Sequence, residues 1–119
     1  MGLHEMILRL KAHVDAPKMG MIASHLGVVR GTSRDGRSVE AIEVSYDHKV
    51  LDGIIRDTKM LPGIVDVLVE TYEGRLDVGD DILAVAVAGD IRENVFAALF
   101  KTVDRIKREA SNKKELFTE

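Results

Sequence analysis

The feature that most constrains this chain is an unbroken apolar run from Ile82 to Ala88. A half-buried strand alternates apolar and polar residues, whereas a strand that is buried on both faces reads as a continuous apolar segment. The run therefore predicts a strand in the interior of the protein, with other elements over both of its faces. With 119 residues, 45% of them hydrophobic, the chain is large enough to form such a core without a disulfide or a structural metal.

A long amphipathic helix is predicted directly after this run. One apolar stripe at the helical period is formed by Val95, Leu99, Val103, Ile106 and Ala110. Asp90 is the predicted N-cap and Glu93 completes a capping-box pattern, so the helix should start near Ile91 or Arg92. Arg92 and Lys107 are then roughly 22 Å apart along the helix. They can serve one small anion only if a second copy of the chain supplies one of them.

The remaining pattern predicts further strands and one short helix. The predicted strands are residues 8–14, 21–30, 39–46, 64–69 and 82–88, and the short helix follows Asp47 as its cap and ends before residue 61. Gly27 indicates a bulge or a close backbone approach. Turn residues at 32–37 join the second and third strands into a hairpin, and residues 74–80 form a loop. We expect one α+β domain over residues 1–119, with a mostly antiparallel sheet and two helices.

Composition and charge exclude several classes of function. A net charge of −3 argues against nucleic-acid binding, which normally needs clustered basic residues. The absence of cysteine excludes a disulfide framework, a thiolate metal site and sulfur carried on this chain, and a reducing cytoplasm is the expected location. The four histidines lack the paired spacing of zinc sites, so no metal is expected. No stretch approaches eighteen apolar residues, so no membrane association is expected.

Cationic side chains at the ends of two segments are the candidate binding residues. Residues 31–38 approach the phosphate-binding P-loop pattern, but a strand follows them instead of a helix, so a hairpin turn explains their glycines better. Arg30 ends an apolar run beside this turn, where a guanidinium can bind phosphate or carboxylate with two hydrogen bonds. Lys107, Arg108, Lys113 and Lys114 follow the long helix, and composition alone favours their explanation as cations that stabilise a helix C-terminus.

The order and spacing of these pieces resemble the large, catalytic subunit of molybdopterin synthase, the MoaE family. The resemblance extends from about Met21 to Glu115. It rests on Gly27-Val28-Val29-Arg30, Gly36, Val39, Ile42-Glu43, Tyr46, Pro62, the segment Gly-Arg-Leu-Asp-Val-Gly at 74–79, Arg92, Phe96, Asp104, Lys107 and Lys113-Lys114-Glu115. It implies a fold of the α/β-hammerhead type.

The resemblance also implies a reaction and the residues that carry it. Family members transfer sulfur from the C-terminal thiocarboxylate of a small ubiquitin-like subunit, the MoaD-like partner, to cyclic pyranopterin monophosphate in molybdenum cofactor biosynthesis. By resemblance, Lys107 and Lys113 are catalytic, and Arg30, Arg92 and Lys114 bind substrate. Either Lys113 or Lys114 matches the second active-site lysine. No cofactor is implied, and a homodimer would bring Arg92 to the neighbour's site.

The chain departs from the family pattern at three places. Ile91-Arg92 stands where the family has a His-Arg pair, Thr71-Tyr72 replaces a second such pair, and a Pro-x-Trp-Lys segment is missing before Lys113. These departures support a second interpretation, a catalytically degenerate paralogue that acts as a dimeric binding or regulatory protein. A third interpretation is an unrelated domain that binds a phosphorylated metabolite.

Overall fold

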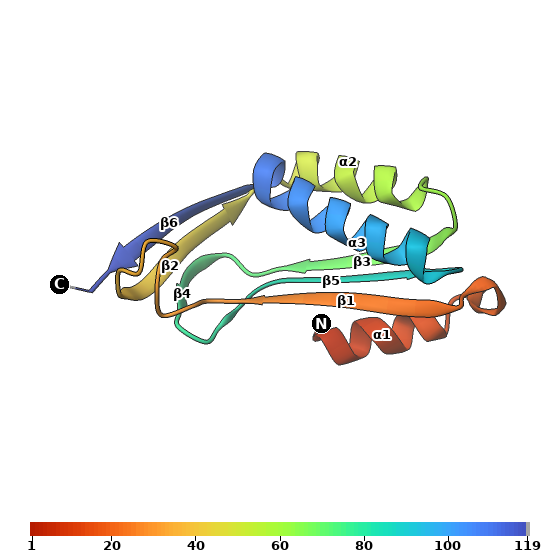
Figure 1. The fold of residues 1–119 in the computed structure, drawn as a ribbon, viewed down its shortest axis with the longest axis horizontal. Coiled ribbons are helices and arrows are strands. Elements are labelled where there is room, and N and C mark those ends of the chain that lie inside the picture. Colours follow the sequence, from red (N-terminus) through yellow and green to blue (C-terminus); the bar gives the residue numbers. More distant parts are fainter. Residues whose placement is uncertain (119) are drawn as a thin grey trace.

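The computed structural model describes residues 1–118, which form an α+β fold of three α-helices and six strands (Figure 1). The helices are α1 (Leu3–Lys11), α2 (His48–Lys59) and α3 (Arg92–Arg105). The strands are β1 (Met21–Val28), β2 (Val39–Tyr46), β3 (Ile64–Thr71), β4 (Gly74–Asp77), β5 (Asp81–Gly89) and β6 (Ser111–Phe117). A short 3₁₀ turn, Ala16–Lys18, precedes β1, and a π-helical turn, Ile106–Ala110, joins α3 to β6. Within residues 1–118, no helix is both long enough and apolar enough to cross a membrane.

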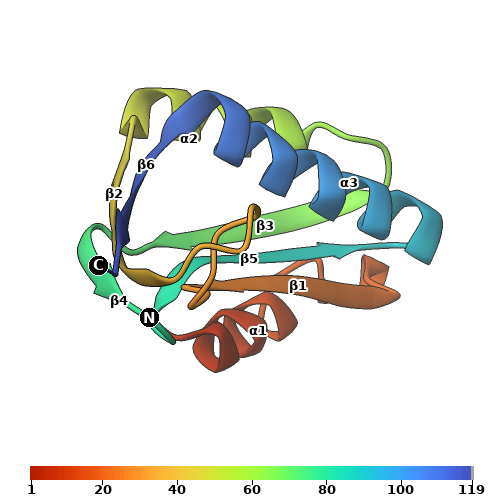
Figure 2. The same ribbon diagram turned by 60° about the vertical axis from the view of Figure 1, so that its left-hand side comes forward.

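The six strands form two antiparallel sheets of three strands each. Their orders are β1-β5-β3 and β4-β2-β6. Helices α2 and α3 cover one face of the first sheet and α1 covers the other, while the second sheet extends beyond the end of the first (Figures 1 and 2). The molecule is therefore elongated, with extents of 53 × 24 × 23 Å. The predicted antiparallel pairing is confirmed.

Strand β5 lies at the centre of the first sheet and is buried on both faces, as its unbroken apolar run predicts. Its larger side chains, Leu83, Val85 and Val87, pack into the main core below α2 and α3. Its alanines, Ala84, Ala86 and Ala88, face α1 and pack with Met6 and Leu10. Because alanine is small, the backbone of α1 can approach the sheet closely on this side. The alternation of large and small residues thus places the large side chains in the main core below α2 and α3 and the small ones against α1.

The prediction of a strand at residues 8–14 is wrong, because most of this segment belongs to α1 or to the turn after it. Met6 and Leu10 are fully buried and lie four residues apart, which is the spacing of one helical face. Leu8 and Val14 belong to the apparent alternation, but both are exposed. The alternation of apolar and polar residues over 8–14 therefore does not mark the buried face of a strand.

The predicted hairpin over 21–46 is also wrong. Strand β1 pairs with β5, whereas β2 pairs with β4 and β6 in the other sheet. The turn at 31–38 therefore carries the chain from one sheet to the next, although Thr32 and Ser38 still form a local bridge. The bulge predicted at Gly27 is confirmed by a register shift between Gly27 and Val28. Strand β4 lies where a loop was expected, and β6 was not predicted.

The boundaries of α2 and the start of α3 agree with the predictions, but α3 ends at Arg105, so Ile106 and Ala110 of the predicted stripe lie in the π-helical turn. The structure has α1 in addition to the two predicted helices, and one predicted cap is wrong. The Asp47 carboxylate accepts hydrogen bonds from the backbone N–H groups of Lys49 and Val50, which confirms it as the N-cap of α2. Helix α3 starts at Arg92, as predicted, but its N-cap is Ile91, which provides no side-chain cap. Asp90 instead accepts hydrogen bonds from the Ile91 N–H and from the Asn94 side chain.

Candidate functional site

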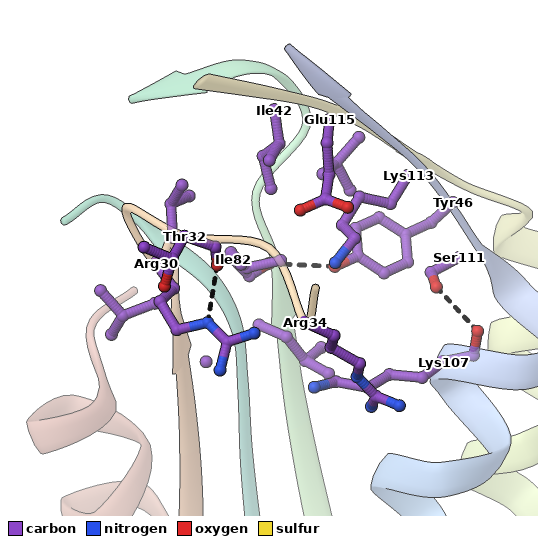
Figure 3. Close-up of a pocket in the computed structure, with 15 residues that line it drawn as sticks. Arg30, Thr32, Arg34, Ile42, Tyr46, Ile82, Lys107, Ser111, Lys113 and Glu115 are labelled. Atoms are coloured by element: carbon purple, nitrogen blue, oxygen red, sulfur yellow. Dashed lines mark hydrogen bonds between the residues drawn. The ribbon is translucent and has the colours of Figure 1, made fainter. Parts of the chain in front are cut away.

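A cavity of about 570 Å³ lies where the two sheets meet, next to the end of α3 (Figure 3). It is lined by the end of β1 and the turn after it, the inner face of β2, the start of β5, the π-helical turn and β6. The lining residues are Gly27, Val28, Val29, Arg30, Thr32, Arg34, Ile42, Val44, Tyr46, Ile82, Leu83, Lys107, Ser111, Lys113 and Glu115. Three of the five predicted site residues, Arg30, Lys107 and Lys113, therefore share one cavity.

Lys107 lies in the π-helical turn, where α3 ends and β6 begins. The Ser111 hydroxyl donates a hydrogen bond to the Lys107 carbonyl oxygen over 3.0 Å. This bond satisfies one of the backbone carbonyls that lack a partner within the helix at its C-terminal end. Arg105 donates to both carboxylate oxygens of Glu109 at 2.8 and 3.1 Å, so an ion pair spans the turn from the outside. Helical turns of this wider kind are rare and frequently occur at functional sites. Here the turn places the lysine at the cavity wall.

Strand alternation separates the two neighbouring lysines of β6. Lys113 lies on the cavity face together with Ser111 and Glu115, opposite the inner residues of β2. Lys114 faces the other side of the sheet, where it lines a separate shallow hollow with Glu43 and Arg75. Because side chains in a strand point alternately to opposite faces, adjacent lysines cannot both enter one cavity. The structure thus brings Lys113, and not Lys114, into the cavity with Lys107.

Two arginines contribute to the cavity from the end of β1 and the following turn. The Arg30 Nε donates to the Thr32 carbonyl oxygen over 2.8 Å, and this bond orients the guanidinium. Arg34 was not predicted, and its side chain forms no ion pair with any of residues 1–118. Figure 3 shows Arg30, Arg34 and Lys107 reaching into the same space from separate segments. The turn that holds Arg34 reverses at Gly36, whose φ of +87° suits glycine.

The uncharged residues that line the cavity include one phenol, that of Tyr46. The Tyr46 hydroxyl donates to the Ile82 carbonyl oxygen over 3.0 Å, which ties β2 of one sheet to β5 of the other. Burial, together with the negative charge of Glu73, raises the pKa of Tyr46 to about 12. Tyr46 is therefore a neutral wall of the cavity at physiological pH and supplies no negative charge to it.

The charges in the cavity strongly favour an anionic ligand. Four cationic side chains, Arg30, Arg34, Lys107 and Lys113, face a single carboxylate, Glu115. This local excess of positive charge occurs on a chain whose net charge is −3. None of the four cations forms an ion pair within residues 1–118, and converging cations of this kind bind phosphate and carboxylate groups well. In residues 1–118, no three His, Asp or Glu side chains gather in a way that would hold a metal ion.

Arg92 lies outside the cavity of its own chain. It begins α3, at the opposite end from Lys107, and its side chain is 80% exposed. Its Nε lies 3.1 Å from the Glu93 carboxylate. The predicted capping box is absent because the N-cap is Ile91, which places Glu93 at the second helical position instead of the third. The distance argument from the sequence therefore holds, because a single chain cannot bring Arg92 to Lys107.

Sequence reasoning missed Arg34, Tyr46, Ser111 and Glu115 as cavity residues. Arg34 lies in the segment at 31–38, whose likeness to a P-loop had drawn attention to phosphate binding. The segment Ser111–Phe117 has no apolar/polar alternation, so β6 and its cavity-facing residues Ser111 and Glu115 gave no strand signal in the sequence. Tyr46 carried no chemical signal of its own, because its position depends on how the two sheets meet.

Comparison with known proteins assigns the chain to a family. Residues 4–109 match the family described as "MoaE protein". The chain belongs to the MoaE family. A molybdopterin synthase catalytic subunit from Ralstonia nicotianae is 34% identical over 98 residues, which cover 79% of this chain and 55% of that protein. The chain thus spans about half the length of this curated relative.

Solved structures of similar proteins share the fold. Molybdopterin cofactor biosynthesis protein E from Burkholderia multivorans superposes with a TM-score of 0.78 at 30% identity, covering 99% of this chain and 82% of that one. A complex of subunits 1 and 2 of the molybdopterin-converting factor from Helicobacter pylori contains a chain with a TM-score of 0.73 at 15% identity. The coverage there is 98% of this chain and 80% of that one.

Proposed function

We propose that this MoaE-family chain is a catalytic subunit of the molybdopterin synthase type, formed by residues 1–119 as one domain and acting in the cytoplasm. In this proposal it transfers sulfur from the thiocarboxylated C-terminus of a MoaD-like small subunit to cyclic pyranopterin monophosphate. The observation that carries the proposal is the cavity that holds Lys107 and Lys113 together with two arginines. The name of the Ralstonia relative supports the reaction, and the two-subunit Helicobacter complex supports the partner.

The cavity suits this chemistry because both reactants are anions. A phosphate and a thiocarboxylate each accept hydrogen bonds from guanidinium and ammonium groups, and Arg30 and Arg34 are the proposed ligands for them. Fixed cations also stabilise the negative charge that develops during acyl and sulfur transfer. Lys107 and Lys113 are the proposed catalytic lysines, able to exchange protons or to act as nucleophiles. The chain has no cysteine, so the sulfur must arrive on the partner.

A homodimer is part of the proposal, and the surface of α3 supports it. Phe96 is 57% exposed and Phe100 is 75% exposed, although large aromatic side chains are usually covered in folded proteins. Together with Leu99 and Val103 they line a hollow of about 350 Å³ that also includes residues of the edge strand β1. Lys107 lines both this hollow and the cation-lined cavity. An apolar partner on α3 would therefore border the site.

The spacing along α3 specifies how a second copy would contribute. Arg92, Phe96 and Phe100 fall on one stripe of α3, because four-residue steps return to nearly the same face. Lys107 follows in the π-helical turn and lines the same hollow as the two phenylalanines. A two-fold axis that passes between Leu99 and Phe100 is equidistant from positions 92 and 107. Two copies of α3 packed antiparallel about that axis would place each Arg92 beside the Lys107 of the other copy. The proposed role of Arg92 as a substrate ligand in the neighbour's site depends on this arrangement.

The decisive experiment for the proposed function is a reconstituted sulfur-transfer assay. Purified protein is mixed with a thiocarboxylated MoaD-like subunit and cyclic pyranopterin monophosphate, and formation of the dithiolene product is followed. We expect turnover by the unchanged protein and its loss in Lys107→Ala. The matched control is Lys101→Ala, which removes an exposed cation from the same helix outside the cavity. A well-folded protein that gives no product would refute the enzymatic proposal.

A second candidate function is a catalytically degenerate paralogue that binds the same anions without turnover. The observation that favours it is Ile91, which stands where the resemblance implies a histidine and is 51% exposed, without any side-chain hydrogen bond to offer. This candidate predicts binding of the thiocarboxylated tail and a stable dimer, but no dithiolene product in the same assay.

A further inference from the structure

His25 carries an imidazole near Lys107, the proposed catalytic lysine, and has no role in the proposed function. His25 belongs to β1, the edge strand that packs below α3, and its ring lines the hollow formed by Phe96, Phe100 and Lys107. Its Nε2 atom is buried and has no hydrogen-bond partner among residues 1–118. Buried polar atoms in folded proteins are almost always paired, so an unpaired one needs a specific explanation.

The glycine at 27 makes room for this ring. Residues 25 and 27 lie on the same face of β1, and a Cβ atom at position 27 would stand 3.2 Å from Nε2 of His25. Gly27 itself lines the cation-lined cavity. The imidazole nitrogen therefore points along the strand toward the boundary between the hollow and that cavity. Lys107 is the residue that lines both spaces.

The charged surroundings of His25 leave Lys107 as the suitable partner. Burial, and then the positive charge of Lys107, lower the pKa of His25, so the ring is neutral at physiological pH. The hollow contains Asp104 from α3 and Lys107 from the π-helical turn, and Asp104 is already bound by the Arg108 Nε at 3.1 Å. From β5, the strand paired with β1, the position opposite His25 is Val85. Lys107 offers three N–H donors on a flexible stem.

We infer that His25 is a positioning residue for Lys107: rotation of the flexible lysine stem brings its ammonium group to the unpaired Nε2, to which it then donates a hydrogen bond. This contact would hold the ammonium at the wall between the apolar hollow and the cation-lined cavity. It also makes the position of the lysine sensitive to pH, because protonation places an N–H on Nε2 and removes the acceptor. The contact can be tested without the proposed function, although its consequence for catalysis rests on that function.

The first test uses the free protein and needs no ligand. The pKa and tautomer of His25 are measured by imidazole ¹⁵N NMR in the unchanged protein, in Lys107→Met and in the control Lys101→Met. We expect an unprotonated Nε2 and a pKa below 6.5 in the unchanged protein and in the control. The pKa should rise in Lys107→Met, because the nearby positive charge is lost. An Nε2–H tautomer, or the same pKa in Lys107→Met as in the unchanged protein, would overturn the inference.

The second test separates an acceptor from a space-filling ring. His25→Gln keeps a hydrogen-bond acceptor that does not titrate, whereas His25→Phe keeps an aromatic ring without an acceptor. In the sulfur-transfer assay we expect His25→Phe to lower kcat about tenfold or more, as expected for losing a hydrogen bond to a charged group. His25→Gln should retain most of kcat at neutral pH and lose the acidic limb of the pH profile. Equal kcat values for the two variants would contradict the positioning role.

The results of the two tests distinguish a failure of the inference from a failure of the proposed function. If the unchanged protein gives no dithiolene, the proposed function fails, but the NMR measurements still decide whether His25 binds Lys107. If turnover is normal while His25 shows an Nε2–H tautomer, the inference fails and the proposed function stands.

Discussion

Replacing each of the two adjacent lysines of β6 by glutamine tests whether the cavity or the overall charge of the strand binds anions. Lys113→Gln and Lys114→Gln remove the same charge from neighbouring exposed residues of one strand. Lys113 lines the cation-lined cavity, and Lys114 lines the hollow on the other face. The two variants therefore differ only in the face of the sheet from which the charge is removed.

The expected effects of the two variants on anion affinity differ by roughly three- to fiftyfold. A hydrogen bond between a charged donor and a bound anion contributes about 1.5–3 kcal/mol, and each 1.4 kcal/mol changes an affinity about tenfold. Lys113→Gln should therefore weaken the binding of an anion in the cavity by roughly 10- to 150-fold. Lys114 can act on that anion only through screened long-range attraction across the sheet, so its loss should cost less than about threefold at 0.15 M salt.

The assay is a titration with inorganic phosphate, followed by ³¹P NMR or calorimetry at fixed ionic strength. Thermal unfolding of both variants provides the control for folding, and neither should lose stability, because both side chains are exposed. Equal weakening in the two variants would refute the reasoning, since it would mean that the phosphate senses overall charge and not the cavity. A larger effect at Lys114 would instead assign the anion site to the opposite face of β6.

Three further predictions concern the dimer, the core and the pH response. Phe100→Asp should convert the proposed dimer to a monomer in sedimentation at micromolar concentration, because it places a charge at the centre of the α3 stripe; an unchanged dimer would exclude this surface. Ala86→Leu should lower the free energy of unfolding by about 1–3 kcal/mol in urea, because Ala86 is fully buried against α1. Because its pKa is lowered on folding, His25 binds fewer protons in the folded state, so stability should fall as the pH drops below 6.5. His25→Phe should remove that part of the pH dependence, and a slope that persists would assign it to another group.

Some elements could be predicted because their signal lies within a few consecutive residues. The apolar run of β5 and the three-and-four spacing of α3 each reflect the repeat of one element, so both were predicted correctly. Asp47 was recognised as a cap because the N-cap bond joins residues only two and three positions apart. Local geometry of this kind needs no knowledge of the rest of the fold.

Other predictions failed because the deciding contacts are distant in sequence. Residues 8–14 alternate like a strand, yet burial of Met6 and Leu10 against β5 makes most of this segment helical. The turn at 31–38 looks like a hairpin, but its two strands join different sheets. Tertiary packing overrides local preference wherever a short pattern fits two elements.

The sequence by itself determined the central strand, the long helix and the cations that the family resemblance pointed to, because those features follow from residue type and spacing. Only the tertiary structure decided which cations meet. Strand alternation brings Lys113 into the cavity and turns Lys114 away, while the π-helical turn brings Lys107 to Arg30 and Arg34. The physical reason is that a binding site joins side chains from segments far apart along the chain. Their distances depend on how the two sheets and α3 pack together.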